Sequence, residues 1–326
     1  MPEISVDEAI GRALAEEMRR DHRVVMFGEG VATKRADLVK QFGAARVRNT
    51  PLSEGIIAGT AVGAAATGLR PVIDMLFAPF LCYAMDEIVN SAGKLRYVSG
   101  GQFSFPLVVM SQTGGGWGVG AQHNHNLEAW FVHSPGLKVV MPSTADDFRG
   151  LLKASIRDEN PVMFFSDMTL GYTKGEVEEA ETVVPLGKAR IRRTGRDVTL
   201  VSYSKSVNTC MDAAQRLLES GVSAEVIDLR TLKPLDEETI LASVRKTGRL
   251  VVVHEAAGIC GVGAEIAAIT VEKAFRFLKA PVLRVTGPDA PAPSSPVLEQ
   301  AYMPGVESIV EAARGTLSQL QVRAAA

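Results

Sequence analysis

The chain has 326 residues, of which 46% are hydrophobic and 22% are charged, and its formal net charge is -2. This length suits one or two α/β domains with a sizeable core, and the composition is that of a globular protein and not of a disordered or fibrous chain. A net charge so close to zero argues against nucleic acid and anionic membranes as partners, because both require a basic surface.

The first twenty residues predict an amphipathic helix that begins with a capping box of Ser5 and Glu8. They lack the apolar run and small-residue cleavage site of an export signal, and no apolar stretch reaches the roughly 18 residues of a membrane span. We therefore expect a cytoplasmic enzyme or enzyme subunit. The three cysteines, Cys82, Cys210 and Cys260, have no metal-ligand spacing, so we expect them to be small buried side chains.

Short apolar runs alternate with helical segments through the first half of the chain. A small-residue helix is expected after Ser53 and a long one over residues 84–97, with a third after Thr144. Strands are expected at 23–27, from Pro71, from Pro106, at 137–142 and at 161–165. Such alternation is typical of a parallel sheet that is covered by helices on both faces.

The periodicity is lost over residues 166–185, where acids and small residues dominate, as in a surface connection. A second alternating series follows, from DVTLVSY at 197–203 to APVLRV at 280–285. The sequence thus predicts an α/β protein of two doubly wound domains, residues 1–175 and 191–326, joined by a linker at 176–190.

The segment TGGGWGVGAQH at 113–123 follows an expected strand. Gly116, Gly118 and Ala121 match the spacing of a dinucleotide-binding loop, but no acid stands at the end of the next strand to hold a ribose. Two other interpretations stay open: the glycines permit a tight turn, or they bring the backbone close to a ligand or another chain.

Two histidines, His123 and His125, come directly after the glycines. They could bind a metal, although no third ligand is evident nearby, or they could be ordinary loop residues. A histidine that faces a cleft as a proton donor is the more specific hypothesis. His133 and His254 are expected to be structural, and His22 to be solvated.

A single acid, Glu54, stands at the head of the small-residue helix. It could simply complement the helix dipole. If Leu52, Ile56 and Ile57 wall the carboxyl group, however, burial would disfavour its charged form, and a protonated carboxyl group can donate a hydrogen bond to a ring nitrogen. The glycines and alanines that follow suit close packing against another helix.

These residues resemble the β subunits of the 2-oxo acid dehydrogenase family, which includes pyruvate, branched-chain and acetoin dehydrogenases. The resemblance runs nearly the whole length. The strings that carry it are NTPLSEGIIAG at 49–59, GLRPVIDMLFAPF at 68–80, SAGKLRYVSGG at 91–101, GAQH at 120–123, PGLKVVMPST at 135–144, AEVIDLRTLKPLDEETI at 224–240 and VVHEA at 252–256.

The resemblance implies a pyrimidine-binding domain like that of transketolases, followed by a transketolase C-terminal-like domain. It makes Glu54 the acid that hydrogen-bonds the aminopyrimidine ring of thiamine diphosphate and so helps to form the reactive carbanion. Leu52, Leu76 and Phe80 match positions that line the pyrimidine pocket. His123 matches a histidine that faces the reaction centre and assists acyl transfer to a lipoyl group.

The resemblance also implies partners and ions. An α subunit, in a heterotetramer of two α and two β chains, would hold the diphosphate and Mg²⁺, and a lipoyl acyltransferase component would take the acyl group from the small-molecule substrate. The positions that match the family's potassium site are Leu107, Ser155, Ile156, Asp158 and Asn160, and carbonyl and carboxylate oxygens suit such a hard cation.

The chain departs from the family pattern at His123-Asn124-His125, where histidine-serine-glutamine is usual, and at Gly28-Glu29-Gly30, where GED is usual. Both changes bear on the substrate more than on the cofactor. A rival interpretation is therefore a split transketolase-like enzyme that transfers ketol or acyl units without lipoate. A regulatory homologue without activity is disfavoured because Glu54 and His123 are both retained.

Overall fold

The computed structural model describes residues 2–324, and the side chains of residues 2–318. Contacts divide the chain into two compact units. Unit 1 contains the residues up to Thr113 and Gln122–Leu186, and unit 2 contains Gly114–Ala121 and the residues from Gly187 on. Within residues 2–324 no helix is both long and apolar enough to cross a membrane.

Unit 1 is built on a parallel sheet whose strands lie in the order β6-β7-β5-β4-β2-β3. These strands are β2 (Val24–Gly28), β3 (Val47–Asn49), β4 (Arg70–Phe77), β5 (Val108–Thr113), β6 (Lys138–Val140) and β7 (Val162–Asp167). A small antiparallel pair joins β1 (Glu3–Ser5) to β8 (Lys174–Glu176). The long crossovers between neighbouring strands carry the helices, as parallel pairing requires.

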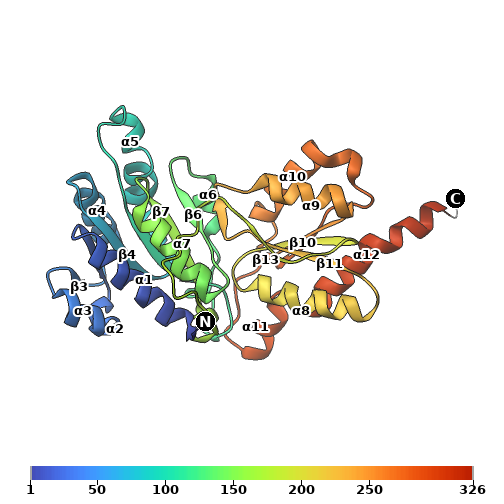
Figure 1. Cartoon of the computed structure of the whole chain (residues 1–326), viewed down its shortest axis with the longest axis horizontal. Coiled ribbons are helices and arrows are strands. Elements are labelled where there is room, and N and C mark those ends of the chain that lie inside the picture. The colour runs from blue at the N-terminus through green and yellow to red at the C-terminus, as the bar shows by residue number, and fades with distance from the viewer. Residues whose placement is uncertain (1, 325–326) are drawn as a thin grey trace. The chain divides into compact units, whose positions relative to one another are not determined.

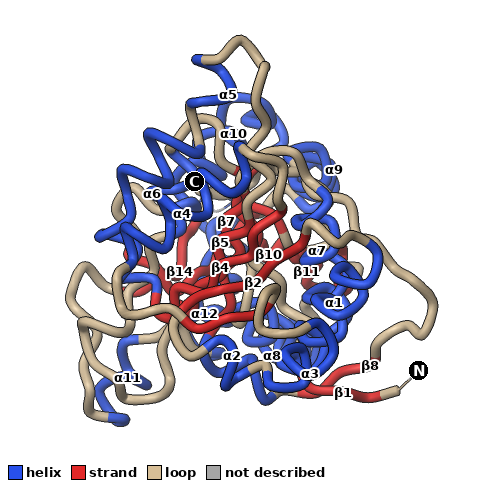
Figure 2. Tube along the Cα trace, turned by 90° about the vertical axis from the view of Figure 1, so that its left-hand side faces the viewer, coloured by secondary structure: helices blue, strands red, loops and turns tan. Residues whose placement is uncertain are grey.

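Helices cover both faces of this sheet (Figures 1 and 2). They are α1 (Val6–Arg20), α2 (Val31–Lys34), α3 (Ala36–Phe42), α4 (Glu54–Ala66), α5 (Leu95–Val98), α6 (Glu128–His133) and α7 (Ala145–Arg157). Three further short elements are the 3-10 helices η1 (Ala78–Ala84) and η3 (Met168–Tyr172) and the π-type helix η2 (Asp86–Ala92). Helices α1 and α7 lie side by side on one face, and α4 packs on β4.

Helix α1 forms as its sequence predicts. The Ser5 side chain accepts a hydrogen bond from the Glu8 backbone N–H at 3.1 Å, and the apolar side chains Ile10, Leu14 and Met18, which recur near helical spacing, are buried. Half of the capping box is absent, because the Glu8 carboxylate pairs with Arg12 instead.

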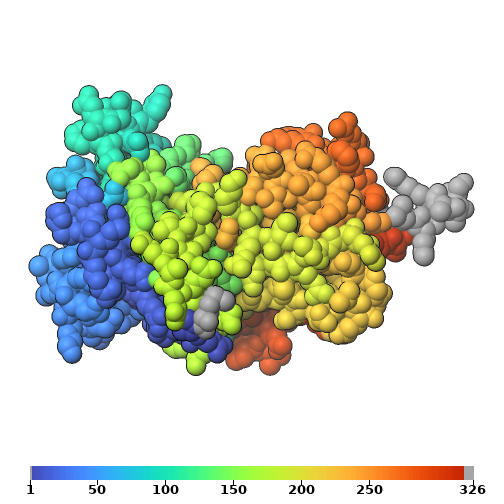
Figure 3. Space-filling model, in the orientation of Figure 1, coloured from blue at the N-terminus to red at the C-terminus, as the bar shows by residue number. Residues whose placement is uncertain are grey.

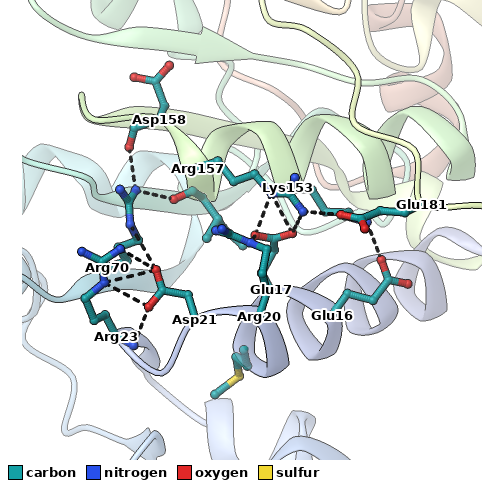
Figure 4. Close-up of polar contacts among 12 residues, drawn as sticks. Glu16, Glu17, Arg20, Asp21, Arg23, Arg70, Lys153, Arg157, Asp158 and Glu181 are labelled. Atoms are coloured by element: carbon teal, nitrogen blue, oxygen red, sulfur yellow. Dashed lines mark hydrogen bonds and ion pairs between the residues drawn. The ribbon is translucent and has the colours of Figure 1, made fainter.

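Charged side chains join α1 to α7 beside this apolar core (Figure 4). Glu17 of α1 is fully buried and accepts hydrogen bonds from Arg157, the shortest at 2.6 Å. Lys153 is also fully buried and donates to Glu16 at 2.7 Å. Arg157 also pairs with Glu181 of the segment that leaves unit 1, so the network ties two helices and the end of the unit together.

Unit 2 has a mixed sheet in the order β14-β13-β10-β11-β9, in which only β9 is antiparallel to its neighbour. The strands are β9 (Arg190–Arg193), β10 (Val198–Ser202), β11 (Ala224–Asp228), β13 (Leu250–Ala257) and β14 (Leu283–Gly287), and β12 (Thr231–Lys233), which does not belong to this sheet, is a further short strand of this part of the chain. The second doubly wound series that the sequence predicts is present.

Helices also lie on both faces of the sheet of unit 2 (Figure 1). Helices α8 (Ser206–Glu219) and α12 (Val306–Ala324) form one apolar core with it, whereas α9 (Glu237–Thr247) and α10 (Val262–Ala274) pack on the other face. A 3-10 turn, η4 (Phe275–Phe277), and α11 (Pro296–Tyr302) complete the unit.

Two expectations about local structure were wrong. The single helix expected over 84–97 is broken into η1, η2 and α5. A Cβ atom added at Gly136 would lie 1.8 Å from the Gly93 carbonyl oxygen, so two backbone segments meet where the helix stops. Of the three cysteines only Cys210 is buried, whereas Cys82 and Cys260 are exposed, because they lie on η1 and on the loop before α10.

Candidate functional site

The predicted pocket residues of unit 1 follow three strands of its sheet: Leu52 and Glu54 come after β3, Leu76 and Phe80 lie at and after the end of β4, and His123 comes after β5. Glu54 is the first residue of α4 and is half-buried. No side chain caps this helix start, since Ser53 makes no capping hydrogen bond. A Cβ atom added at Gly55 would lie only 3.0 Å from the Tyr83 carbonyl oxygen, so the head of α4 abuts the end of η1.

The wall that the sequence predicts around Glu54 is only partly formed within this chain. Ile57 is buried, but Leu52 is 67% exposed and Ile56 is 71% exposed. Both side chains lie on the outward side of the α4 head. The expected desolvation of the carboxyl group by three apolar neighbours is therefore not supplied by this chain, and an added surface would be needed to complete it.

Leu76 occupies an unusual backbone conformation at the end of β4. Its φ is 54°, in the left-handed region that a side chain with a Cβ rarely adopts. The ladder between β4 and β5 shifts register between Asp74 and Phe77, which marks a β-bulge. Bulges concentrate next to active sites, where they redirect side chains.

His123 belongs to an aromatic cluster with two residues from the end of β4 and from η1. Its ring centroid lies 5.1 Å from that of Phe77 and 5.4 Å from that of Phe80, both edge to face. The two phenylalanine rings are themselves 5.9 Å apart. The structure thus brings together His123 and Phe80, two residues that the sequence assigned separately.

His125 lies apart from this cluster. Its ring lies edge to face with that of Trp130, at 6.3 Å between centroids, and partial burial lowers its pKa. Thr113, the last residue of β5, donates to the His125 carbonyl oxygen at 3.4 Å. A metal site built on His123 and His125 gains no support, since residues 2–324 contain no group of three or more His, Cys, Asp or Glu side chains placed to hold a metal ion.

The glycine-rich loop Gly114–Ala121 is held by residues of unit 2 that the sequence analysis missed. Lys205 donates to the Gly115 carbonyl oxygen at 3.0 Å, and Glu255 accepts from the Gly115 N–H at 3.3 Å. Lys205 and Glu255 are also an ion pair at 3.5 Å. The Gly118 N–H donates to buried Glu299 at 2.9 Å. Lys205 follows β10 and Glu255 lies in the adjacent β13, and this placement at neighbouring strands could have indicated the pair.

The dinucleotide interpretation of the same loop is wrong. A dinucleotide fingerprint needs the glycines to open a helix whose N-terminus faces the phosphates. The next helix, α6, begins only at Glu128. Gly116, Gly118 and Gly120 have φ values of 125°, 65° and 74°, so the glycines serve the path of the loop itself.

The residues expected to bind potassium lie together at the opposite end of the sheet, around the start of β7. The Leu107 carbonyl oxygen accepts from the Val162 N–H at 2.8 Å, and Ser155 and Ile156 lie in the last turn of helix α7. The Asp158 carboxylate accepts from the Asn160 backbone and side chain, both at 2.9 Å.

Two resident cations share this cluster. Arg70 donates to the carbonyl oxygens of Ile156 and Asp158, at 2.9 and 3.2 Å, and Lys138 pairs with the Asp158 carboxylate. Burial favours the neutral acid, but the hydrogen bonds from Lys138 and Asn160 outweigh it and hold the pKa of Asp158 below its usual range.

Comparison with known proteins identifies both units. Residues 2–171 match the model of the transketolase pyrimidine binding domain, and residues 187–309 match that of the transketolase C-terminal domain. The acetoin:2,6-dichlorophenolindophenol oxidoreductase subunit beta of Bacillus subtilis (strain 168) is 42% identical over 94% of this chain and 95% of its own length.

The chain belongs to the family of transketolase-like 2-oxo acid dehydrogenase β subunits. The mitochondrial pyruvate dehydrogenase E1 component subunit beta-2 of Oryza sativa subsp. japonica is 45% identical over 96% of this chain and 86% of its own. The 2-oxoisovalerate dehydrogenase subunit beta of Bacillus subtilis (strain 168) is 42% identical, with coverages of 96% and 98%. Family members with three different substrate names are thus similarly close.

A solved structure shows the same fold. A split-gene transketolase, described as an inactive beta4 tetramer, superposes with a TM-score of 0.83 at 26% identity, over 97% of this chain and 99% of that chain. The fold and family expected from the sequence are confirmed.

Proposed function

We propose that this chain is the β subunit of a thiamine-diphosphate-dependent 2-oxo acid or acetoin dehydrogenase, active only together with an α subunit. The observation that carries the proposal is the half-buried Glu54 at the uncapped head of α4, which abuts the end of η1, while Phe80 of η1 contacts the His123 ring. The β-subunit names of relatives at 42 to 45% identity support it.

The residues of this site suit an aminopyrimidine ring. Such a ring is flat and mostly apolar, with nitrogen atoms at its edge, and the residues assigned to it here are the Glu54 carboxyl group and the apolar side chains Leu52, Leu76 and Phe80. Thiamine diphosphate, when bound, would supply the carbon nucleophile for attack on the substrate carbonyl. The role of Glu54 is to share a proton with the ring nitrogen, and a carboxyl group can both donate and accept that hydrogen bond.

His123 is the group that we assign to acid–base work on the substrate side. Its ring is fixed by edge-to-face contacts with Phe77 and Phe80, at 5.1 and 5.4 Å between centroids. A ring held in this way presents its nitrogen atoms in a constant direction, which suits proton transfer during passage of the acyl group to a lipoyl domain.

The exposed apolar residues near Glu54 are the surface that we assign to the α subunit. Leu52 and Ile56 are exposed beside the carboxyl group, and Tyr83 is 75% exposed at the adjoining end of η1. Tyr97 of α5 is 90% exposed, on a segment that stands out from the surface of unit 1, teal in Figure 3. Exposed apolar side chains at one place, as Leu52, Ile56 and Tyr83 are at the head of α4, mark an interface, and covering them would desolvate Glu54.

We further propose that the α subunit holds the diphosphate and Mg²⁺ in a heterotetramer of two α and two β chains. A lipoyl acyltransferase component would accept the acyl group. Potassium binding at Leu107, Ser155, Ile156, Asp158 and Asn160 stays a prediction, supported by their gathering around the start of β7. The domain limits 1–175 and 191–326 also stay a prediction.

The test of the proposal is the Glu54→Gln variant in the assembled complex. The amide is nearly isosteric, so folding and assembly should persist, but it cannot share a proton with the ring. Exchange of the thiazolium proton for deuterium, read by NMR after acid quench, should slow by at least about two powers of ten. Glu87→Gln is the matched control, because Glu87 lies beside the same helix start, with Oε1 3.5 Å from a Cβ placed on Gly55. Exchange as fast as wild type in Glu54→Gln would reduce Glu54 to a helix-end charge.

A split transketolase-like enzyme without lipoate is the second candidate, favoured by the structural match at TM-score 0.83. The 26% identity of that chain, against 42 to 45% for the dehydrogenase β subunits, ranks it lower. Assays of the co-expressed complex with pyruvate, branched-chain 2-oxo acids and acetoin, with 2,6-dichlorophenolindophenol as acceptor, separate the two. Ketol transfer between sugar phosphates without any acceptor reduction would select the second candidate.

A further inference from the structure

The strained residue Leu76 is held in place by groups on two neighbouring strands of unit 1, β4 and β5. Its N–H donates to Oδ1 of Asp74 at 3.1 Å, and its carbonyl oxygen accepts from the Ser111 hydroxyl at 3.3 Å. Asp74 is 4% exposed and Ser111 is 3% exposed, so both bonds are shielded from water. A left-handed conformation at a residue with a side chain is strained and persists only where the surroundings enforce it.

The buried Asp74 carboxylate has a counter-charge at its other oxygen. Lys34 of α2 lies 3.2 Å from Oδ2, and its own side chain is 36% exposed. A buried carboxylate without such a partner would be strongly unfavourable. Asp74 therefore links two things: the segment after β2 that carries Lys34, and the bulge that carries Leu76.

The bulge decides which way the next residues face. Side chains alternate along a strand, so one inserted residue reverses the faces of all that follow. Phe77 comes directly after the bulge and contacts the His123 ring. Leu76 is one of the apolar residues that we assign to the pyrimidine ring.

We infer that Asp74 is a positioning residue for cofactor binding: its Oδ1 holds Leu76 in the left-handed conformation that aims this side chain, and the Phe77 ring after it, into the pyrimidine pocket. This inference rests on the proposed function, since it requires that the pocket binds the pyrimidine ring of thiamine diphosphate. Asp74 itself does not touch the cofactor.

Unit 2 contains a matched control for the experiment. At the end of β11, Oδ1 of buried Asp228 accepts from the Arg230 N–H at 3.0 Å, and Arg230 has a φ of 58°. The local geometry is thus the same as at Asp74 and Leu76, but no pocket residue of our proposal lies there. Replacement of either aspartate should make the backbone next to it more flexible, but only replacement of Asp74 should weaken cofactor binding.

The experiment uses the assembled complex of α and β subunits with Asp74→Ala, Asp74→Asn or Asp228→Ala in this chain. Hydrogen exchange by mass spectrometry should show faster exchange at residues 70–80 in Asp74→Ala and at residues 224–232 in Asp228→Ala.

The dissociation constant of thiamine diphosphate with Mg²⁺, measured by calorimetry, should rise at least about tenfold in Asp74→Ala, the size expected for one lost hydrogen bond to a charged group. It should stay within about twofold of wild type in Asp228→Ala. Asp74→Asn keeps an acceptor oxygen and should rescue most of the affinity.

A double variant separates positioning from general damage. Glycine adopts a positive φ without being held, so in a Leu76→Gly background the further change Asp74→Ala should weaken cofactor binding by less than about twofold. A full tenfold loss in that background, or faster exchange at 70–80 in Asp74→Ala with unchanged cofactor affinity, would overturn the inference. Unchanged exchange at 70–80 would overturn it as well. A wild-type complex that binds no cofactor would instead refute the proposed function, and the exchange measurement would still report whether Asp74 holds Leu76.

Discussion

At Glu54 the sequence predicts the position of a side chain in a helix, but it does not predict the exposure of the neighbouring side chains. An acid before a run of small residues can be located from the pattern alone, and Glu54 does begin α4. The exposure of Leu52 and Ile56 could not be foreseen, because the direction of a side chain at a helix head depends on the turn that precedes it. The strain at Leu76 was also invisible, since leucine carries no sign of a positive φ.

His123 should matter more for acyl transfer than for the earlier steps. We expect His123→Ala to retain part of the reaction with an artificial acceptor while transfer to a lipoyl domain falls by a further factor of about a hundred, as for loss of a positioned acid or base. Paired steady-state assays with both acceptors measure the two effects. His133→Ala, which removes an exposed histidine at the end of α6, should change neither, and equal losses in both assays of His123→Ala would leave that residue only a structural role.

His254 should make the stability of unit 2 depend on pH. It is fully buried, its Nε2 accepts from the Gly263 N–H at 3.2 Å at the start of α10, and its ring stacks on Tyr203. Burial lowers its pKa to about 4 from 6.5, the Ala256 carbonyl oxygen opposes this shift, and Arg284 adds to it. Between these two pKa values the unfolded chain therefore binds more protons than the folded chain. The stability that neutral His254 contributes is complete above the unfolded pKa, and it is lost as the pH falls toward the folded pKa.

Urea unfolding at pH 7 and pH 5 measures this dependence. The wild type should lose about 2 kcal/mol more over this interval than His254→Gln, which cannot titrate. His22→Gln, at an exposed histidine, is the control and should keep the pH dependence of the wild type. A His254→Gln variant with the wild-type slope would show that other groups carry it.

At the scale of elements, the ionic network between α1 and α7 allows a comparison within one helix. Glu17 is fully buried against Arg157, whereas Glu8 of the same helix pairs with Arg12 at the surface. Glu17→Gln should lower the free energy of unfolding by about 3 kcal/mol, because two arginines lose their buried counter-charge. Glu8→Gln should cost less than about 1 kcal/mol. Chemical denaturation of both variants measures the two losses. Equal losses of unfolding free energy would mean that burial does not strengthen the Glu17 contacts.

The elements that the sequence predicted well are those whose apolar residues recur with a clear period. Strand β2 and helices α1 and α7 follow their expected positions closely. The prediction of one helix over residues 84–97 was wrong for a physical reason. Two backbone segments meet at Gly93 and Gly136, and the sequence of the segment alone does not indicate this contact. The contacts of Lys205 and Glu255 with Gly115 were missed for the same reason, since they join residues far apart in the chain.

At the scale of the whole molecule, the single chain should be an incomplete binding site. We expect the purified chain alone to bind thiamine diphosphate poorly, because Leu52 and Ile56 leave Glu54 open and the groups for diphosphate are assigned to the α subunit. Calorimetry with Mg²⁺ should show binding restored when the α subunit is added. Tight, magnesium-dependent binding by the lone chain would contradict the shared site.

The assignment of Gly114–Ala121 to unit 2 has a consequence for how such a gene can be cut and recombined. The chain passes between the units at residues 113–114, 121–122 and 186–187. A break within residues 176–190, the predicted linker, would leave Lys205, Glu255 and Glu299 on one piece and their backbone partners, Gly115 and Gly118, on the other. If the C-terminal half is exchanged between relatives, residues Gly114–Ala121 therefore come from one protein, and the side chains at positions 205, 255 and 299 that contact them come from another. The two halves should be inherited as one piece, or change together.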